Sequence, residues 1–246
     1  MKKILLCLLL STLTTKPFFD CDPKFYMTFD SGISFAMQPN FCIPDKHWSD
    51  VQEGYNSSLG SSILYGLEAG ADLNDWLSMG TGFTYRGPYN YCKYQTPIDG
   101  NPPHVRYFDL ENISFMYNVF FNRTQNPRWC YDVCCFTLAP YLGFGIGASR
   151  NNLYNFYTYL ENRPEKENIK SVMTPYIEKS FAAQFMAGVE ADYNEHLSLA
   201  AGYRFFYGGN IVTNNYNIDA DKIFRVSPWQ GKLKANELVF SLHVTF

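Results

Sequence analysis

The sequence predicts an all-β fold, an eight-stranded antiparallel up-and-down transmembrane β-barrel. Three observations lead to this prediction. Apolar side chains alternate with small or polar ones in eight stretches, and short turns alternate with long polar connections. Aromatic residues make up 18% of the chain and charged residues only 17%, whereas charged residues are about 25% of an ordinary soluble domain. This composition favours many half-buried strands.

Alternation with a period of two places successive side chains on opposite faces of a strand. In the first stretch, bulky apolar residues occupy one face: Phe25, Met27, Phe29, Ile33 and Phe35. The intervening residues are smaller or polar: Tyr26, Thr28, Asp30, Gly32 and Ser34. The pattern returns over residues 63–72, 77–86, 108–121, 136–148, 181–192, 197–205 and 237–246. In the third stretch, Leu77 falls on the apolar face with Phe83.

The connections between these stretches are of two kinds. Short turns are expected at residues 74–75 and 194–196, and long polar loops near 37–58, 87–106, 149–176 and 208–234. Membrane barrels have short turns on one side and long loops on the other, with apolar residues outward and polar residues inward. An even number of strands places both chain ends on the short-turn side. The connection over residues 122–135 is too long for a simple hairpin.

Residues 1–19 have the order of a cleavable export signal. Lys2 and Lys3 precede an apolar run over residues 4–10, and small polar residues follow at 11–15. Cleavage is expected between residues 15 and 21, which leaves residues 20–246 as the barrel domain. A lipoprotein anchor is not expected, because Phe19 and Asp20 stand where small residues would precede Cys21. No later run of about 18 apolar residues predicts a transmembrane helix.

The polar face of the predicted strands carries ionisable residues that would point into the lumen. They are Asp30, Glu68, Asp72, Arg86, Glu190, Asp192, Arg204, Glu237 and His243. Eight strands leave an interior just wide enough for side chains to fill, and buried charges are retained only when paired. We interpret this set as a structural charge network. A gated ion path or a pH-sensitive plug is the alternative.

Seven cysteines are present, and Cys7 lies in the predicted signal. Disulfides persist in the oxidising compartment that an exported chain enters. Cys42 and Cys92 fall in the first two long loops. The remaining cysteines, Cys21, Cys130, Cys134 and Cys135, fall on the short-turn side, where their pairing stays open. Because a bridge cannot cross the membrane, Cys42 paired with Cys92 is the specific prediction, with free thiols as the alternative.

The last stretch, in which Phe240, Leu242, Val244 and Phe246 alternate, resembles the assembly signal that outer-membrane barrels present to the insertion machinery. The segments PYLGFGIG at 140–147 and LSLAAGYR at 197–204 resemble strands of the OmpA, OmpX and Opa-like family of eight-stranded barrels. The resemblance implies the bacterial outer membrane, periplasmic termini, and lipid and the barrel assembly machinery as partners. It does not imply the periplasmic domain of OmpA-like proteins, because the sequence ends with the eighth stretch.

The leading functional expectation is a non-enzymatic surface protein that displays long loops for adhesion, host or self interaction, or envelope integrity. These loops contain many Tyr and Asn residues, such as Tyr89, Asn90, Tyr91 and Tyr154. Such residues suit a recognition surface or an aromatic girdle at the lipid interface.

Three alternative functions stay open. They are a narrow pore or channel for small hydrophobic molecules, a lipid-modifying enzyme, and a soluble lipocalin-like barrel with its faces inverted. His196 and Ser198 have the spacing seen in a barrel-borne lipid A deacylase, but His196 falls in a short turn, away from the outer leaflet. No catalytic, cofactor or metal site is predicted. A net charge of −3 and no run of basic residues argue against nucleic-acid binding.

Overall fold

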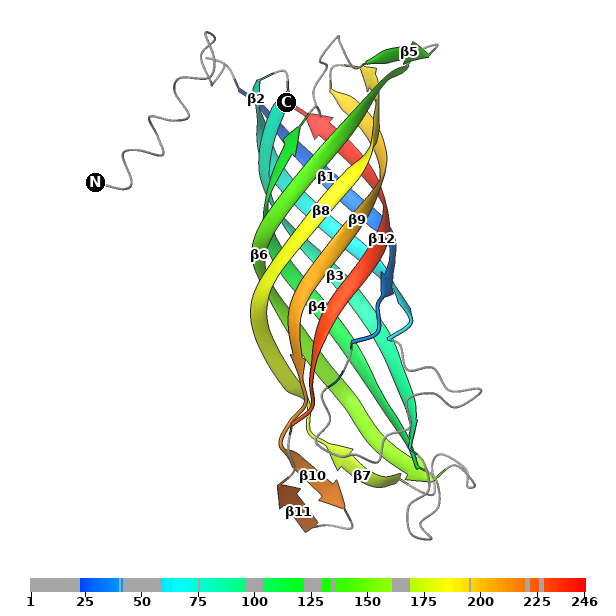
Figure 1. Ribbon diagram of the computed structural model, residues 1–246. Coiled ribbons are helices and arrows are strands. Elements are labelled where there is room, and N and C mark those ends of the chain that lie inside the picture. The colour runs from blue at the N-terminus through cyan, green and yellow to red at the C-terminus, as the bar shows by residue number, and fades with distance from the viewer. Residues whose placement is uncertain are drawn as a thin grey trace, which may run out of the picture.

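Eight long strands form one closed antiparallel barrel in the computed structural model (Figure 1). The structure describes residues 23–39, 41, 59–74, 76–95, 104–121, 130–133, 136–160, 169–194, 196–219, 222–225 and 228–246. The barrel strands are β1 (Lys24–Ala36), β2 (Ser61–Asn74), β3 (Leu77–Gln95), β4 (His104–Phe121), β6 (Phe136–Leu160), β8 (Tyr176–Asn194), β9 (Leu197–Val212) and β12 (Gln230–Thr245). Each strand pairs with the next, and β12 pairs with β1. This ring confirms the predicted eight-stranded up-and-down barrel.

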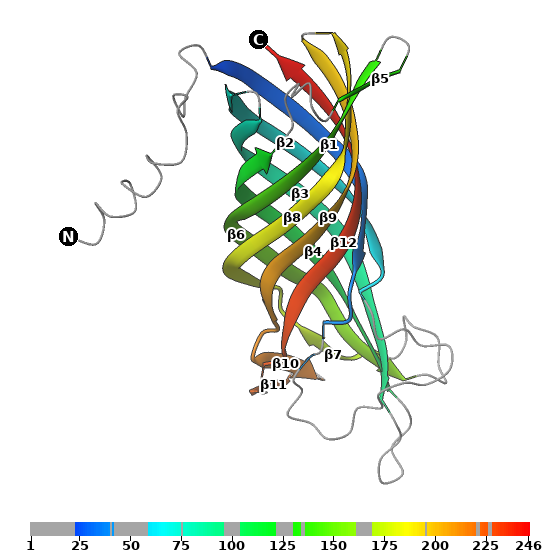
Figure 2. The same ribbon diagram turned by 45° about the horizontal axis from the view of Figure 1, so that its top comes forward.

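The barrel has two different ends (Figures 1 and 2). At the turn end, the predicted short turns join β2 to β3 and β8 to β9. Each turn is held by an asparagine, because Asn74 accepts a hydrogen bond from the Trp76 main chain and Asn194 accepts one from the His196 main chain, at 3.0 and 2.9 Å. β1 begins and β12 finishes at this end, where the Phe246 main-chain N–H donates to the carbonyl of Phe25.

Four short strands extend the barrel hairpins. β5 (Tyr131–Val133) pairs with β6 at the turn end, within the connection that is too long for a simple hairpin. β7 (Ile169–Met173), β10 (Tyr216–Asp219) and β11 (Lys222–Arg225) lie at the opposite end, which we call the mouth end (Figure 1). Among the described residues, no helix is long and apolar enough to cross a membrane. The predicted signal over residues 1–19 lies outside the described ranges and stays a prediction.

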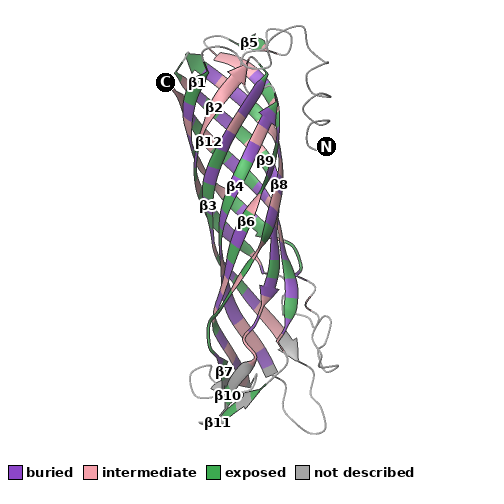
Figure 3. Cartoon of the chain, turned by 90° about the vertical axis from the view of Figure 1, so that its left-hand side faces the viewer, coloured by how far each residue is buried: buried purple, intermediate pink, exposed green. Residues whose placement is uncertain are grey.

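Burial alternates along the barrel strands (Figure 3). On β1, Phe29 is 50% exposed, whereas Thr28 and Ser34 are buried. Exposed apolar side chains form an outward apolar band around the barrel. It includes Phe29, Ile33, Tyr65, Leu67, Phe83, Phe115, Leu142, Phe144, Ile146, Phe181, Leu199, Leu238 and Phe240. The soluble lipocalin-like alternative is therefore wrong, because such a protein would hold this face inside.

The strands are longer than the sequence pattern predicts. β3 continues to Gln95, β6 continues to Leu160, and β12 begins at Gln230, so much of the chain predicted as loops over 87–106, 149–176 and 208–234 is strand. The alternation continues there with a polar outward face, which is the pattern of a strand that leaves the lipid for water. The loop prediction was wrong because that polar face was taken as a sign of irregular chain. Residues 42–58 of the first predicted loop lie outside the described ranges.

The inward faces of these longer strands build an apolar core at the mouth end. It comprises Leu59, Tyr89, Tyr91, Phe108, Leu110, Met116, Leu153, Phe156, Met173, Ala182, Phe206, Ile211, Trp229 and Leu233. The rings of Tyr91 and Phe108 stack at 4.4 Å, and Trp229 meets Phe156 at 5.3 Å. Tyr89 and Tyr91 were expected in a surface loop or girdle, and this placement was wrong because both point inward.

Leu77 is also placed differently from the prediction. It was expected on the outward face with Phe83, yet it is buried. The β2–β3 pairing shifts between Asp72 and Asn74, so that Asn74 faces Leu77 while Asp72 faces Ser78. An extra residue in one strand interrupts the alternation of side chains, which explains the buried position of Leu77.

Close backbone approach inside the barrel requires a glycine at position 70. A Cβ at Gly70 would contact the main-chain oxygen of Met79 and would lie 2.5 Å from Cζ of the buried Tyr26 ring. We expect Gly70→Val to lower the free energy of unfolding by about 1–3 kcal/mol through overpacking. The measurement is the temperature at which the detergent-extracted barrel loses its folded gel mobility. Ala69→Val, one residue away on the outward face, is the control, and equal effects of the two variants would contradict this explanation.

Candidate functional site in the barrel lumen

A layer of paired charges crosses the barrel interior below the apolar core. Arg86 on β3 binds Glu237 on β12, with Nε 2.5 Å from Oε1, and both side chains are fully buried. Arg204 on β9 binds Asp30 on β1, with NH2 2.5 Å from Oδ2, and its NH1 lies 3.7 Å from Oε2 of Glu237. The four residues form a continuous chain of alternating charge that connects opposite walls of the barrel.

Further hydrogen bonds satisfy the other donors of Arg86 and the acceptors of Glu237. Arg86 donates through NH1 to Asn112 and Ser114, at 3.1 and 2.8 Å, and its guanidinium carbon lies 3.5 Å from the ring centroid of Phe206. Ser34 donates to Glu237 at 2.8 Å. A buried ion pair is tolerable only when its other donors and acceptors are also satisfied. Arg86 and Glu237 meet that requirement, whereas Nε and NH1 of the buried Arg204 have no hydrogen-bond partner among the described residues.

A second polar layer lies nearer the turn end. Glu68 accepts hydrogen bonds from the Tyr26 hydroxyl at 2.9 Å and from the Asn118 amide at 2.5 Å. Gln184 donates to Asn118 at 2.8 Å. The space left between the two layers is a cavity of about 10 Å³, lined among others by Arg204 and Glu68. That is about the size of the smallest site that holds one water molecule.

The other predicted lumen residues lie close to the turn end. His243 is buried, with Nδ1 3.0 Å from the Thr28 hydroxyl. Asp72 accepts a hydrogen bond from Ser78 at 2.6 Å. Glu190 and Asp192 are buried on β8. The structure thus links Asp30, Arg86, Arg204 and Glu237 directly and leaves the remaining five predicted residues in other layers.

An outward polar patch on the extended parts of β3, β4 and β6 was not predicted as a site. Asp109 accepts hydrogen bonds from Asn90, Tyr107 and Asn155, at 2.5, 2.7 and 2.9 Å. Glu111 accepts from Tyr85 and Tyr154, at 3.1 and 2.9 Å. The signal that could have revealed this patch is that Asn90, Asp109 and Glu111 alternate with apolar residues that point inward.

Two of these tyrosines are held in the neutral form. Burial raises the pKa of Tyr107, and its hydrogen bond to Asp109 raises it further. Burial and then the hydrogen bond to Glu111 raise the pKa of Tyr154. A hydrogen bond donated to a carboxylate favours the protonated phenol, since the phenolate would face a like charge. Both hydroxyls therefore remain donors that fix the two carboxylates.

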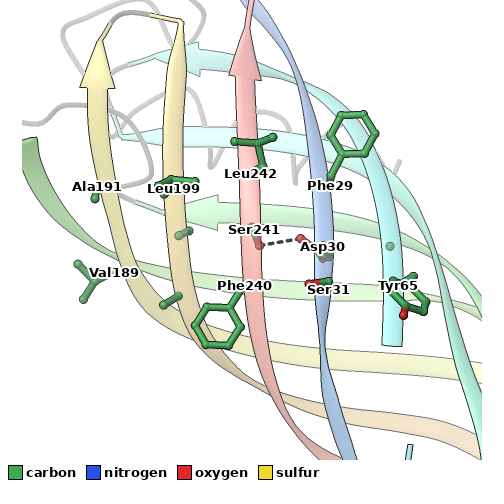
Figure 4. Close-up of a pocket in the computed structure, with 13 residues that line it drawn as sticks. Phe29, Asp30, Ser31, Tyr65, Val189, Ala191, Leu199, Phe240, Ser241 and Leu242 are labelled. Atoms are coloured by element: carbon green, nitrogen blue, oxygen red, sulfur yellow. Dashed lines mark hydrogen bonds between the residues drawn. The ribbon is translucent and has the colours of Figure 1, made fainter. Parts of the chain in front are cut away.

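A hollow of about 830 Å³ lies in the outward apolar band (Figure 4). Phe29, Leu199, Phe240 and Leu242 line it from β1, β9 and β12. Asp30 also borders the hollow and accepts a hydrogen bond from Ser241 at 2.6 Å. The lining chemistry suits an acyl chain or another apolar molecule.

The predicted assembly residues alternate on the outer side of β12. Phe240, Leu242 and Phe246 are exposed, and Val244 is half-buried. Their role in insertion stays a prediction.

The predicted His196 and Ser198 pair lies in two different surroundings. His196 is exposed in its turn, with Nδ1 3.2 Å from the main-chain oxygen of Thr245. Ser198 is buried on the inward face of β9. This placement gives the histidine a structural contact at the turn end.

The predicted disulfide cannot be located, because Cys42 lies outside the described residues. Cys92 is half-buried on β3. The residues that precede the two cysteines are in contact, since the rings of Phe41 and Tyr91 lie 5.5 Å apart. Tyr91 points into the barrel, so this contact does not test the pairing of Cys42 with Cys92, which stays a prediction. Of the short-side cysteines, only Cys130 falls within the described ranges.

Comparison with known proteins finds several similar solved structures. Three similar solved structures are Neisserial surface protein A (NspA), with 18% identity and a TM-score of 0.48; OprG from Pseudomonas aeruginosa, with 12% and 0.49; and Ail of Yersinia pestis in complex with the heparin analogue sucrose octasulfate, with 10% and 0.39. They cover 90%, 91% and 92% of this chain, and 97%, 97% and 99% of their own chains. No curated protein matches the sequence.

The family description that matches the sequence is "Outer membrane protein beta-barrel domain", over residues 5–246. The match includes every barrel strand from β1 to β12. It confirms the resemblance to small outer-membrane barrels and explains why apolar side chains point outward. The chain belongs to the outer membrane β-barrel family, and it is a protein of the bacterial outer membrane.

Proposed function

We propose that this barrel is a non-enzymatic surface protein that presents a rigid extracellular face for interaction and does not conduct. The observation that carries the proposal is the filled lumen. The apolar core closes the mouth end, and the Arg86–Glu237 layer crosses the interior beneath it. A conducting path would have to pass both layers. Separating the two side chains inside the barrel would leave two buried charges uncompensated, which favours the closed arrangement.

The proposed orientation places the mouth end outside the cell and both chain termini in the periplasm. Outer-membrane barrels have short periplasmic turns and longer extracellular connections. Here the short turns and the β12 terminus share one end, and β7, β10 and β11 extend the other (Figure 1). The polar outward faces of β3, β4 and β6 beyond the apolar band then stand in water.

The displayed surface combines aromatic and amide side chains on paired strands. The rings of Tyr107 and Tyr157 stack at 5.0 Å, and Tyr159 lies 6.0 Å from Tyr157. Asn90 and Asn155 flank them through Asp109. Tyrosine supplies rigid amphipathic contact area and asparagine supplies adaptable hydrogen bonds. Because the strands hold these groups in place, less entropy is lost when a partner binds.

A route for small hydrophobic molecules is the second candidate, favoured by the apolar hollow beside Asp30. Passage from the hollow to the lumen would require paired strands such as β1 and β12, and the ion pair of Arg204 with Asp30, to separate. The paired state argues against a permanently open path. The conductance and uptake measurement below decides between the two candidates.

We expect the purified barrel to give no conductance steps in planar bilayers, and no faster uptake of a small apolar dye into liposomes than protein-free liposomes show, because the lumen is filled. A porin reconstituted in the same way supplies the positive control. Regular single-channel steps would support the pore, and dye uptake without steps would support the hydrophobic route. Either outcome would remove the closed-lumen proposal.

We expect the double variant Tyr107→Ala/Tyr157→Ala to weaken the attachment of barrel-expressing cells to host-cell monolayers or to one another. The reason is the loss of rigid aromatic area, which is typically worth about 1–2 kcal/mol or more at a recognition surface. Attachment is counted under flow in a strain that does not otherwise adhere. Tyr65→Ala, in the outward apolar band, is the control. Expression that promotes no attachment, or equal losses in the two variants, would contradict a recognition role for this face.

We expect Glu237→Gln to lower the free energy of unfolding by about 3–5 kcal/mol, because Arg86 and Arg204 lose their shared carboxylate. The double variant Arg86→Met/Glu237→Leu should lose clearly less than the sum of its two single variants, because the residues are coupled. Urea unfolding in liposomes measures the wild type, Glu237→Gln, the double variant and its two single variants. Lys24→Gln, an exposed cation on β1, is the control. Additive losses would show that the two side chains do not act as a pair.

A further inference from the structure

We infer that the small cavity between the two polar layers of the lumen binds one water molecule, and that this water links Arg204 to Gln184. Arg204 belongs to the layer of paired charges, and Gln184 belongs to the second polar layer nearer the turn end. The site is independent of the proposed function, because the lumen can be closed whether or not the two layers are linked.

Arg204 and Gln184 both carry polar atoms that no protein group satisfies among the described residues. Arg204 donates through NH2 to Asp30, while its Nε and NH1 have no hydrogen-bond partner. Gln184 donates through Nε2 to Asn118, while its Oε1 has no hydrogen-bond partner. The two residues are only 5% and 6% exposed. Because a buried donor or acceptor without a partner is destabilising, these atoms require a ligand.

The strand register brings the two side chains to the same space. In the β8–β9 pairing, Arg204 is opposite Met186. Gln184 precedes Met186 by two positions on β8, so it points to the same face as Arg204 and lies diagonal to it. Diagonal neighbours in an antiparallel pair are about 7–8 Å apart. A water that accepts one hydrogen bond and donates another holds its two partners roughly 4.5–5.5 Å apart, which long side chains on diagonal positions can reach.

The size of the cavity selects a single water molecule. Arg204 and Gln184 both line it, and its volume is about 10 Å³. A site needs roughly 10–15 Å³, measured with a water-sized probe, to hold one water, so an organic ligand is too large. Buried waters make about three hydrogen bonds, and the lining offers a third polar partner in Thr84 or Glu68.

The charges around the cavity favour a neutral ligand that both donates and accepts hydrogen bonds. Asp30 and Glu68 line the cavity, and their carboxylates repel an anion such as chloride. Arg204 repels a metal ion or another cation in the same way. Water meets both requirements, because it accepts a hydrogen bond from the Arg204 guanidinium and donates one to Oε1 of Gln184.

The bound water joins the two layers into one network. From Glu237 the connection runs to Arg204, crosses the water to Gln184, and continues through Asn118 to Glu68. A buried polar network stabilises one arrangement only when its members are satisfied. The water therefore fixes the guanidinium of Arg204 between the layers, where its contact with Asp30 alone leaves two of its nitrogens without a partner.

The first measurement uses the folded wild-type barrel in lipid bilayers. Water-edited solid-state NMR reports how much magnetisation each N–H group receives from water. We expect the Nε–H of Arg204 to receive severalfold more than the Nε–H of Arg86. Arg86 is the internal control, because its Nε donates to Glu237 and both side chains are fully buried. Equal transfer to the two groups would overturn the inference.

A variant tests the link to Gln184. Gln184→Met removes the acceptor and keeps the length of the side chain, so we expect the transfer to Arg204 to fall to the level of Arg86. Thr28→Val is the matched control, because it removes a buried hydroxyl that contacts His243 and does not line the cavity. Unchanged transfer in Gln184→Met, or an equal loss in the control, would contradict the link. If Gln184→Met does not fold, the wild-type measurement still decides.

Diffraction from crystals of the barrel grown in bromide identifies the ligand. We expect an electron-density peak about 2.7–3.2 Å from an Arg204 nitrogen and from Oε1 of Gln184, with no anomalous signal from bromide. An anomalous peak would show an anion and overturn the water site, and so would the lack of any peak. Conductance would remove the closed-lumen proposal, whereas a missing density peak would remove only the water site.

Discussion

Every barrel strand depends on one constraint, the pairing of β1 with β12. In hydrocarbon, an unpaired strand edge leaves N–H and C=O groups without partners, at several kcal/mol for each group. The pairing runs from Tyr26 with Thr245 to Ala36 with Ala235. A ring closed in this way has one face for lipid and one for its own interior. Inside so narrow a ring, small residues such as Gly70 are needed wherever a large ring such as that of Tyr26 crosses.

The charged side chains of the interior find their partners in separate layers. Two arginines cannot neutralise all the carboxylates of the interior. They pair with Glu237 and Asp30, and these four residues come from four different strands. Glu68 relies on neutral donors, Tyr26 and Asn118. Above these layers the interior becomes apolar, because the strands have left the membrane and ordinary burial from water again stabilises packing. Within the membrane the apolar side chains of these strands therefore point outward, and beyond it they point inward.

Where the strands contact lipid, the alternation of apolar and polar residues was sufficient to predict the fold. Phe29 outward and Ser34 inward follow from alternation alone, and so do the turns at Asn74 and Asn194. The extended parts of β3, β4 and β6 could not be predicted in that way, because a water-exposed strand has a polar outer face like a loop. Leu77 depends on a register shift, which is set by the turn geometry of both strands.

The candidate site was predicted as a set of residues but not as a set of partners. Alternation placed Arg86, Arg204 and Glu237 inside, yet it cannot tell which acid reaches which arginine across the ring. That choice depends on strand tilt and on the heights at which distant strands meet.

The composition of the mouth core has a consequence for how the barrel is formed. Phe41 precedes β2, Phe108 and Phe156 come from β4 and β6, and Trp229 immediately precedes β12. The core therefore joins the first and last parts of the barrel chain and is completed only when the eighth strand arrives. When β12 joins the ring, the indole of Trp229 passes from water to an aromatic environment. The fluorescence of Trp229 is therefore a probe of ring closure.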